Sequence, residues 1–297
     1  MITACAQHEW TTPDGELFPY SVWESVTPPR AVVVAVHGLS GAALDYEPLG
    51  SHLAGQGIAT YALELRGQGN DPVPSRRGDL TSLEQWYADL TAFFALVRGQ
   101  HPGAPLFYYG ESMGAALLVR FLADAGPSLQ PAGLILASPV IQVPGNPTWI
   151  RRAVFHVCQF LTPQRRVDIS KYTKRRDPND PKYWVTRDAT HRQWFETASH
   201  RITSFTFRFF KCLFDLFGGC MEAAAQLTVP VLVVYANHDV YIMPATVEEF
   251  FTRLGSHQKE LQLFPESYHL LLHDFDKAQV LNRIERWLRD QLAGAKS

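Results

Sequence analysis

Short apolar runs alternate with amphipathic stretches along most of the chain. Apolar runs bounded by glycine, proline or polar residues are typical of buried strands in a parallel sheet. They lie at 32–36, 58–63, 106–109, 134–137, 229–235 and 261–264. Stretches with an apolar position about every 3.6 residues are typical of helices. They lie between the runs, at 82–98, 115–125, 245–254 and 278–292. This alternation predicts an α/β protein with a mostly parallel central sheet and flanking helices.

Two regions depart from this alternation. Residues 7–10 and 17–23 flank Pro13-Asp14-Gly15, which predicts an antiparallel hairpin at the edge of the sheet. Between 140 and 226 we find no convincing buried strand, and the apolar pieces have a helical character. These pieces lie at 149–161, 191–200 and 202–217. We therefore interpret residues 140–226 as a helical cap, or lid, inserted into a core made of residues 1–139 and 227–297.

The composition narrows the class of protein. The 297 residues are 46% hydrophobic, and 27 basic side chains nearly balance 29 acidic ones. Because proteins that bind DNA or RNA usually carry a basic excess, we expect no nucleic-acid partner. The 4 cysteines form no CxxC pair, which argues against a disulfide scaffold or a zinc cluster and suits a reducing compartment. With no recognisable signal peptide or transmembrane run, the expectation is a cytoplasmic protein.

The strongest chemical signal is Gly110-Glu111-Ser112-Met113-Gly114. This G-x-S-x-G pattern follows a predicted strand and precedes a predicted helix, which is the context of a nucleophile elbow. The tight turn strains the central residue and leaves little room for side chains beside it, hence the glycines. Ser112 is therefore the candidate nucleophile.

A serine nucleophile needs a base, and the base needs an acid that orients it. Asp239 follows the predicted strand 229–235, and His269 follows the predicted strand 261–264. Serine, acid and histidine thus occur in the order that nucleophile-elbow hydrolases use, each after its own strand. The carboxyl ends of parallel strands share one edge of a sheet, where open α/β folds place their ligands. We predict that Asp239 and His269 act with Ser112.

Two alternatives concern neighbouring histidines. His238 could compete as the base, but it precedes the acid in the sequence. His269 and His273 have the i, i+4 spacing of a metal pair, yet no further ligand run supports a metal site. We expect neither a metal nor another cofactor.

An ester hydrolase also needs backbone N–H groups that stabilise the developing oxyanion. One should come from Met113, directly after the nucleophile, and the other from the loop after the first parallel strand. That loop begins His37-Gly38-Leu39, and we choose the N–H of Leu39 as the second donor. His37 is interpreted as a residue that ties down the loop.

These residues together resemble the α/β-hydrolase superfamily, and within it the serine aminopeptidase S33 / hydrolase-4 group. That group includes monoacylglycerol lipases and bacterial lysophospholipases. The matching segments are His37-Gly38, Arg66-Gly67-Gln68-Gly69, the elbow at 110–114, and residues 134–139, 227–230 and 268–273. Glu64 stands where the group usually has Asp, a departure that concerns a structural turn. The resemblance implies a serine ester hydrolase that acts on monoacyl lipids, a monoacylglycerol or a lysophospholipid, through an acyl-enzyme.

The features of the sequence that bear on the substrate lie in the predicted cap, residues 140–226. Apolar stripes at 149–161 and 205–217 are more often faces that pack against the core, but apolar surface in excess of one packing face favours an acyl pocket or a membrane-facing lip. Basic residues cluster at 151–152, 165–166 and 171–176, and we hypothesise that they bring the cap into transient contact with a membrane surface. The alternatives are a small-ester carboxylesterase, an N-terminal peptidase, and a binding protein without catalysis.

Overall fold

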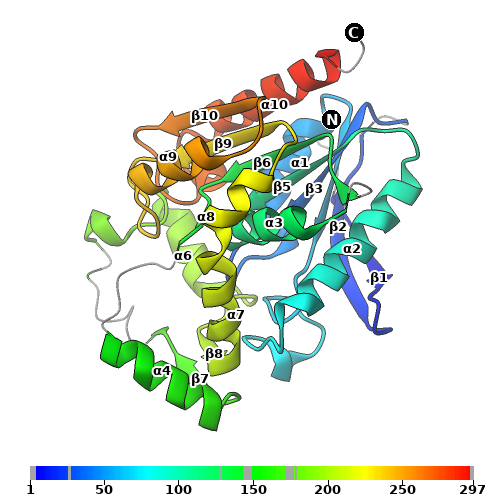
Figure 1. The fold of residues 1–297 in the computed structure, drawn as a ribbon. Helices are drawn as coiled ribbons and strands as arrows, with labels where there is room; N and C mark the ends of the chain where they lie inside the picture. Colours follow the sequence, from blue (N-terminus) through cyan, green and yellow to red (C-terminus); the bar gives the residue numbers. More distant parts are fainter. Residues whose placement is uncertain are drawn as a thin grey trace.

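The computed structural model describes residues 5–25, 28–126, 129–142, 149–170, 177 and 179–294. Its centre is an eight-stranded sheet in the order β1-β2-β4-β3-β5-β6-β9-β10 (Figure 1). The strands are β1 (Cys5–Thr11), β2 (Leu17–Trp23), β3 (Ala31–Val36), β4 (Ile58–Leu63), β5 (Leu106–Glu111), β6 (Gly133–Ala137), β9 (Val231–Ala236) and β10 (Lys259–Phe264). From β4 to β10 all neighbouring strands are parallel. The mostly parallel sheet predicted from the sequence is confirmed.

Helices cover both faces of this sheet (Figure 1). Helices α1 (Glu47–Ala54) and α10 (Lys277–Gly294) pack on one face, and α2 (Leu83–Gln100), α3 (Met113–Asp124) and α9 (Pro244–Arg253) pack on the other. Successive side chains of a strand point to opposite faces, so Val32 and Val34 join one apolar cluster while Val33 and Ala35 join the other. Every residue of β3 is buried, as its uninterrupted apolar run predicts.

The predicted hairpin is confirmed, since β1 and β2 pair antiparallel and β2 pairs antiparallel with β4. Helix α1 was not predicted. It contains Pro48 and Gly50, two residues that hide a helical pattern. Gly50 is needed there because a Cβ would come 2.2 Å from Cδ2 of Trp23, which packs across the helix. Helix α2 also continues through Gly99, where the sequence suggested an end.

The chain between β6 and β9 adds elements outside the main sheet. They are α4 (Trp149–Leu161), β7 (Arg166–Asp168), η4 (Pro181–Tyr183), α6 (Ala189–Thr197), β8 (Ser204–Thr206), α7 (Phe207–Gly218), α8 (Cys220–Ala223) and η5 (Ala224–Gln226). In Figure 1 α4, β7 and β8 stand apart from the sheet at the lower left. The boundaries of the cap at 140 and 226 stay a prediction. Parts of the stretches 140–148 and 171–178 lie outside the described residues.

One prediction within this region is wrong. Residues 202–206 were expected to be helical, but 204–206 form β8, which pairs antiparallel with β7. The helix α7 begins only at Phe207, because the Oγ1 of Thr206 accepts the N–H of Phe209 at 3.1 Å and caps it. The expectation of no buried strand between 140 and 226 therefore missed a short, partly buried two-stranded sheet.

Residues 179–201, which we call the strap, cross from η4 through α6 to the loop before β8.

Among the described helices of the protein, none combines the length and the apolar character that a membrane span requires.

Candidate active site

Ser112 lies in the turn between β5 and α3, where it is the N-cap residue of the helix. Its φ of 56° and ψ of −117° place it in the left-handed region that side chains rarely adopt. The turn brings α3 against the end of β3, so closely that a Cβ on Gly114 would lie 2.1 Å from the carbonyl oxygen of Val36. The elbow motif thus folds as its glycines predict, and the strain gathers at the candidate nucleophile.

Asp239 and His269 meet at the same edge of the sheet. Asp239 follows β9, His269 follows β10, and Nδ1 of His269 is 2.7 Å from Oδ2 of Asp239. Both side chains are buried, at 3% exposure for His269 and 1% for Asp239. The other carboxylate oxygen, Oδ1, accepts the N–H groups of Tyr241 at 2.8 Å and Ile242 at 3.3 Å. With Nδ1–H donating to Asp239, Nε2 of His269 is left as the proton acceptor.

A second carboxyl group, that of Glu111, lies at this edge of the sheet and was not among the predicted site residues. It is the last residue of β5 and is buried at 8% exposure. Burial raises its pKa to about 7, while the nearby His269 opposes that shift. For His269, burial lowers the pKa, but Asp239 and Glu111 outweigh burial and leave the pKa raised. The place of Glu111 inside the G-x-S-x-G motif could be read from the sequence, but its burial beside His269 could not.

The loop after β3 touches the nucleophile. A Cβ on Gly38 would lie 2.9 Å from Cβ of Ser112, so this glycine allows the close approach. His37 fixes the loop, because its Nε2 accepts the N–H of Leu65 at 3.0 Å and its Nδ1 lies 2.9 Å from the carbonyl oxygen of Gly38. Burial lowers the pKa of His37 to about 4, so its ring is neutral. His37 therefore ties down the loop, as the sequence suggested.

The two predicted oxyanion donors each follow one of the two residues in this contact, Gly38 and Ser112. Leu39 follows Gly38, and Met113 is the first residue of α3. Within the described ranges, neither of their N–H groups donates a hydrogen bond to another protein group. Both N–H groups are thus free to donate to a further acceptor, and their role as oxyanion donors stays a prediction.

The structure does not join all three predicted residues. In the part of the chain that it describes, Ser112 Oγ makes no hydrogen bond to His269. Such contacts often tighten only when a substrate is bound. His238 is exposed and its ring stacks on Tyr268, with centroids 5.2 Å apart, instead of pairing with Asp239. His273 turns its Nε2 to the carbonyl oxygen of Asp45, at 2.8 Å.

Glu64, the departure from the family pattern, supports the same loop. Its Oε1 accepts the N–H of Ala43 and the side-chain amide of Asn70, each at 2.9 Å. Burial raises the pKa of Glu64 to about 7, while these two hydrogen bonds oppose the rise.

The described residues contain no group of three or more His, Cys, Asp or Glu side chains arranged to hold a metal ion.

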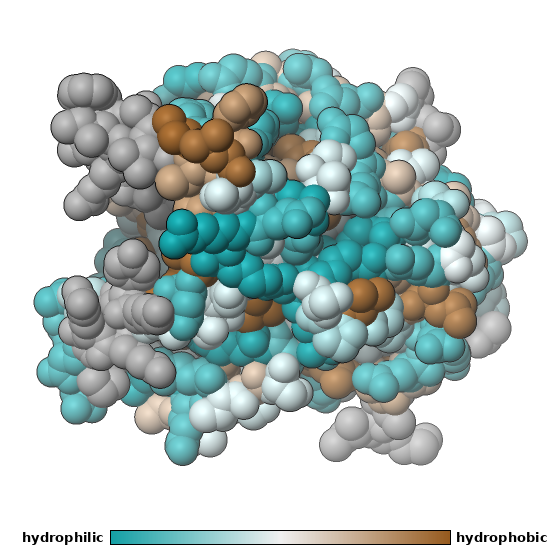
Figure 2. Space-filling view, turned by 90° about the horizontal axis from the view of Figure 1, so that it is seen from below, coloured by the Kyte–Doolittle hydropathy of each residue, from teal (hydrophilic) through white to brown (hydrophobic). Residues whose placement is uncertain are grey.

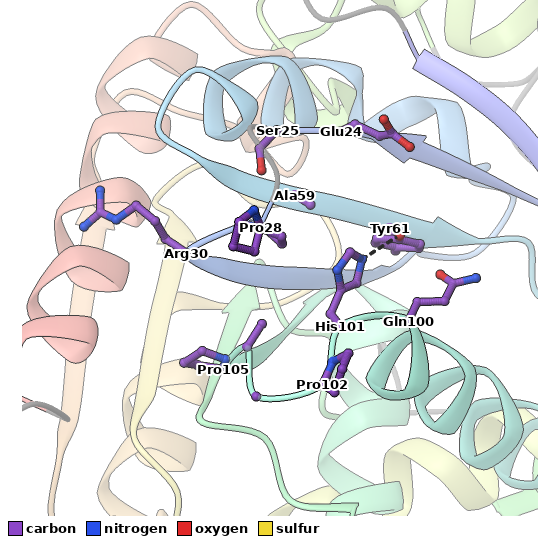
Figure 3. Close-up of a pocket in the computed structure, with 13 residues that line it drawn as sticks. Glu24, Ser25, Pro28, Arg30, Ala59, Tyr61, Gln100, His101, Pro102 and Pro105 are labelled. Carbon is purple, nitrogen blue, oxygen red and sulfur yellow. Dashed lines mark hydrogen bonds between the residues drawn. The ribbon is translucent and has the colours of Figure 1, made fainter.

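A groove of about 570 Å³ lies at the opposite edge of the sheet, where β3, β4 and β5 begin. Figure 3 shows Pro28, Arg30 and Pro105 around it, and Tyr61 joined to His101 by a hydrogen bond of 2.8 Å. Because Ser112, Asp239 and His269 follow the carboxyl ends of their strands, this groove is separate from the candidate active site.

Known proteins resemble this chain in sequence. The family model described as serine aminopeptidase, S33 (hydrolase-4) matches residues 27–276. A monoacylglycerol lipase of Mycolicibacterium smegmatis is 25% identical over 97% of this chain and 98% of its own length. The human monoglyceride lipase is 21% identical over 95% of this chain and 90% of its own length.

Solved structures share the fold. A soluble variant of the monoglyceride lipase from Saccharomyces cerevisiae, in complex with a substrate analog, superposes with a TM-score of 0.79 at 19% identity, covering 98% of this chain and 96% of that one. A thermostable carboxyl esterase from Bacillus coagulans, in complex with glycerol, superposes with a TM-score of 0.81 at 17% identity, covering 97% and 99%.

Proposed function

This chain belongs to the serine aminopeptidase S33 family and is an ester hydrolase with the α/β-hydrolase fold, and we propose that it cleaves monoacyl lipid esters with Ser112, His269 and Asp239. The substrate class is a monoacylglycerol or a lysophospholipid. One observation carries the proposal. It is the buried hydrogen bond of 2.7 Å between His269 and Asp239, at the sheet edge where the strained Ser112 stands.

The chemistry follows from these positions. Nε2 of His269 accepts the proton of Ser112 Oγ as the oxygen attacks the ester carbonyl carbon. The N–H groups of Leu39 and Met113 donate to the oxyanion of the tetrahedral intermediate. His269 then gives its proton to the leaving alcohol, which leaves an acyl group on Ser112. A water molecule, deprotonated by His269, then attacks the acyl carbon; the bond to Ser112 Oγ breaks, the fatty acid leaves, and His269 returns the proton to Oγ.

Asp239 has two tasks in this scheme. Its Oδ2 fixes the tautomer of His269 and stabilises the ring when it carries the proton. Its Oδ1 is held by the N–H groups of Tyr241 and Ile242, so the carboxylate cannot turn away. The raised pKa of His269 agrees with an acid partner that favours the charged ring.

Apolar side chains between β6 and β9 support a lipid substrate. Phe155 of α4 contacts Phe207 and Phe214 of α7, with ring centroids 5.8 and 4.9 Å apart. Beyond them, α4 exposes Val157 by 56%, Phe160 by 81% and Leu161 by 68%. Figure 2, which views the molecule from below, shows an apolar patch at its upper left and further apolar patches elsewhere on a mostly polar face. Apolar surface on this scale suits an acyl chain.

The same end of α4 supports transient membrane contact. Arg165, four residues after Leu161 in the sequence, is exposed. Arg166 is exposed too, but it donates to the carbonyl oxygens of Ser75, Arg77 and Ser204, so it is committed to the protein. Of the other basic residues of the hypothesis, residues 171–176 and the side chains of residues 151–152 lie outside the described part of the structure. Apolar side chains flanked by a cation are typical of surfaces that enter a lipid interface.

Labelling and turnover test the catalytic part of the proposal. A fluorophosphonate should label the wild-type protein at Ser112, and Ser112→Ala should remove both labelling and hydrolysis while the far-UV spectrum stays unchanged. Hydrolysis that persists in the folded Ser112→Ala variant would refute the nucleophile.

A chain-length series tests the substrate class. We expect kcat/KM to rise from short to long acyl chains on p-nitrophenyl esters, and monoacylglycerols or lysophospholipids to be turned over. A preference for acetate or butyrate esters would favour a carboxylesterase, and cleavage of amino-acid amides would favour a peptidase. Binding without turnover would favour a ligand-binding protein.

Vesicle flotation tests the membrane contact. Phe160→Ser with Leu161→Ser should reduce association with anionic phospholipid vesicles, whereas Leu17→Ser, at an exposed position of β2, should not. If the wild-type protein does not float with the vesicles, the contact is refuted.

A further inference from the structure

The loop between β10 and α10 carries His269 and holds two aspartates that fix the residues just before it. Oδ2 of Asp274 accepts the N–H of Tyr268 at 3.1 Å, and Oδ2 of Asp276 accepts the hydroxyl of Ser267 at 2.8 Å. The Asp274 side chain is fully buried. Between β10 and α10 the only regular element is η6 (Leu271–His273), so these side-chain contacts define where His269 stands.

The strap reaches this loop through Arg187. Its Nε donates to Oδ1 of Asp274 at 2.6 Å, its backbone N–H donates to Oδ2 of Asp274 at 3.2 Å, and its Nη2 donates to Oδ2 of Asp276 at 2.7 Å. One guanidinium thus bridges the two aspartates. Among the residues the structure describes, Arg187 is the cation that pairs with the buried carboxylate of Asp274.

Two further hydrogen bonds from the strap reach the residues that follow His269. The N–H of Leu270 donates to the carbonyl oxygen of Val185 at 2.8 Å, and Oγ1 of Thr186 donates to the carbonyl oxygen of His273 at 2.7 Å. Three consecutive residues of the strap, 185–187, therefore hold the chain that follows the histidine, and Arg187 reaches the residues before it through Asp274 and Asp276. Arg187 is the member whose charge compensates a buried aspartate.

We propose that Arg187 is a positioning residue for the reaction, which holds His269 in register with Asp239 through Asp274 and Asp276. This inference rests on the proposed function of His269 as the base. Without Arg187 the carboxylate of Asp274 remains buried and unpaired, so the loop must shift to hydrate it. A displacement of the base by about 1 Å can cost 100-fold in rate. The catalytic histidine on the core is thereby coupled to the chain inserted between β6 and β9.

The chain offers a matched control. Arg208 of α7 also pairs with a carboxylate of the core, donating to Oδ1 of Asp79 at 2.6 Å and also to its Oδ2. The exposure of the two arginines is similar, at 23% for Arg187 and 27% for Arg208. The described contacts of Asp79 do not include the loop that carries His269. Arg208→Ala therefore removes a comparable ion pair without touching the base.

Kinetics separates positioning from general stabilisation. On a short p-nitrophenyl ester, Arg187→Ala should lower kcat and the rate of fluorophosphonate labelling by about 10- to 100-fold, with KM nearly unchanged. Arg187→Lys should recover part of the loss, because an ammonium supplies the charge but not the two-pronged geometry. Arg208→Ala should lower the melting temperature but leave kcat within a factor of about two. Equal kcat losses in Arg187→Ala and Arg208→Ala, or no loss in Arg187→Ala, would overturn the proposal.

Proton NMR supplies a readout independent of hydrolysis. The low-field resonance of the Nδ1–H of His269, hydrogen-bonded to Asp239, should broaden or shift in Arg187→Ala and remain in Arg208→Ala. An unchanged resonance in Arg187→Ala would overturn the proposal whatever ester the enzyme cleaves. Conversely, the resonance could change in Arg187→Ala while fluorophosphonate fails to label the wild-type protein. That result would refute the proposed function and leave the positioning role of Arg187 standing.

Discussion

The central sheet and the strap are held in place by different forces. In β3 and β6 every residue is buried, and every one is apolar or glycine. In the strap only Thr186 and His200 are buried, and both are polar. None of the residues of α6 is buried. The strap is fixed by hydrogen bonds and ion pairs to the loop of His269, whereas the sheet is fixed by apolar packing on both faces.

This difference separates stability from activity. Burial of apolar side chains contributes most of the free energy of folding, so changes in the sheet should unfold the protein. Polar contacts contribute less to net stability but specify geometry. Changes at the strap and at the loops that it touches should therefore alter the rate more than the stability.

The largest effect is expected at the loops that follow the strands. Asp239→Asn should lower kcat by about 10⁴-fold, because the amide no longer holds His269 in the tautomer that accepts the proton of Ser112. The free energy of unfolding should change much less than the equivalent of this rate loss. Kinetics on a p-nitrophenyl ester and urea unfolding measure the two quantities. A loss of stability as large as the loss of rate would break the contrast between loops and sheet.

The next effect tests the sheet against the strap directly. Leu136→Ala in β6 removes a fully buried side chain and should cost about 3 kcal/mol of unfolding free energy. Trp194→Ala in α6 removes a larger side chain that is 42% exposed, and should cost under about 1 kcal/mol. Urea unfolding of both variants decides the matter. Equal costs would mean that the strap is held by apolar packing after all.

A smaller effect is expected from Glu111, whose burial raises its pKa from 4.5 to about 7. The folded protein keeps a proton that the unfolded chain releases, so the free energy of unfolding falls as pH rises between about 4.5 and 7. Glu111→Gln removes this penalty. It should stabilise the protein by about 1–3 kcal/mol at pH 8 and give no gain at pH 4.5. A gain that does not depend on pH would contradict the buried carboxyl group.

The smallest effect concerns the pH profile of the reaction. Only neutral His269 can act as the base, and its pKa is raised above 6.5 because Asp239 and Glu111 outweigh burial. Glu111→Gln removes one negative charge, so the pKa of His269 should fall and the acid limb of kcat/KM should move to lower pH. Glu64→Gln is the matched control, since Glu64 faces the loop after β3. A limb that moves equally in both variants would show that Glu111 does not act on His269.

Local signals predicted much of the fold and part of the site. The apolar runs predicted β3, β4, β5 and β6 to within two residues at each end, because a strand buried on both faces is recognised from its own continuous apolar run. The helix α1 was missed because Pro48 and Gly50 mask its pattern, and Gly50 makes sense only once Trp23 packs on it. The strands β7 and β8 were missed because three residues carry no periodicity. That Ser112, Asp239 and His269 form one catalytic unit stays a prediction.

The sequence alone predicted that Ser112, Asp239 and His269 each follow a strand, because turns and strand ends depend mainly on neighbouring residues. The sequence favoured His269 over its neighbours, but which atoms each histidine contacts was decided only by tertiary structure. Asp239 pairs with His269, while His238 stacks on Tyr268 and His273 binds the carbonyl oxygen of Asp45. The link from Arg187 to the loop of His269 spans 87 residues and left no mark in any local pattern. The reason is physical: the partner of a buried polar group is set by which distant segments packing brings within about 3 Å.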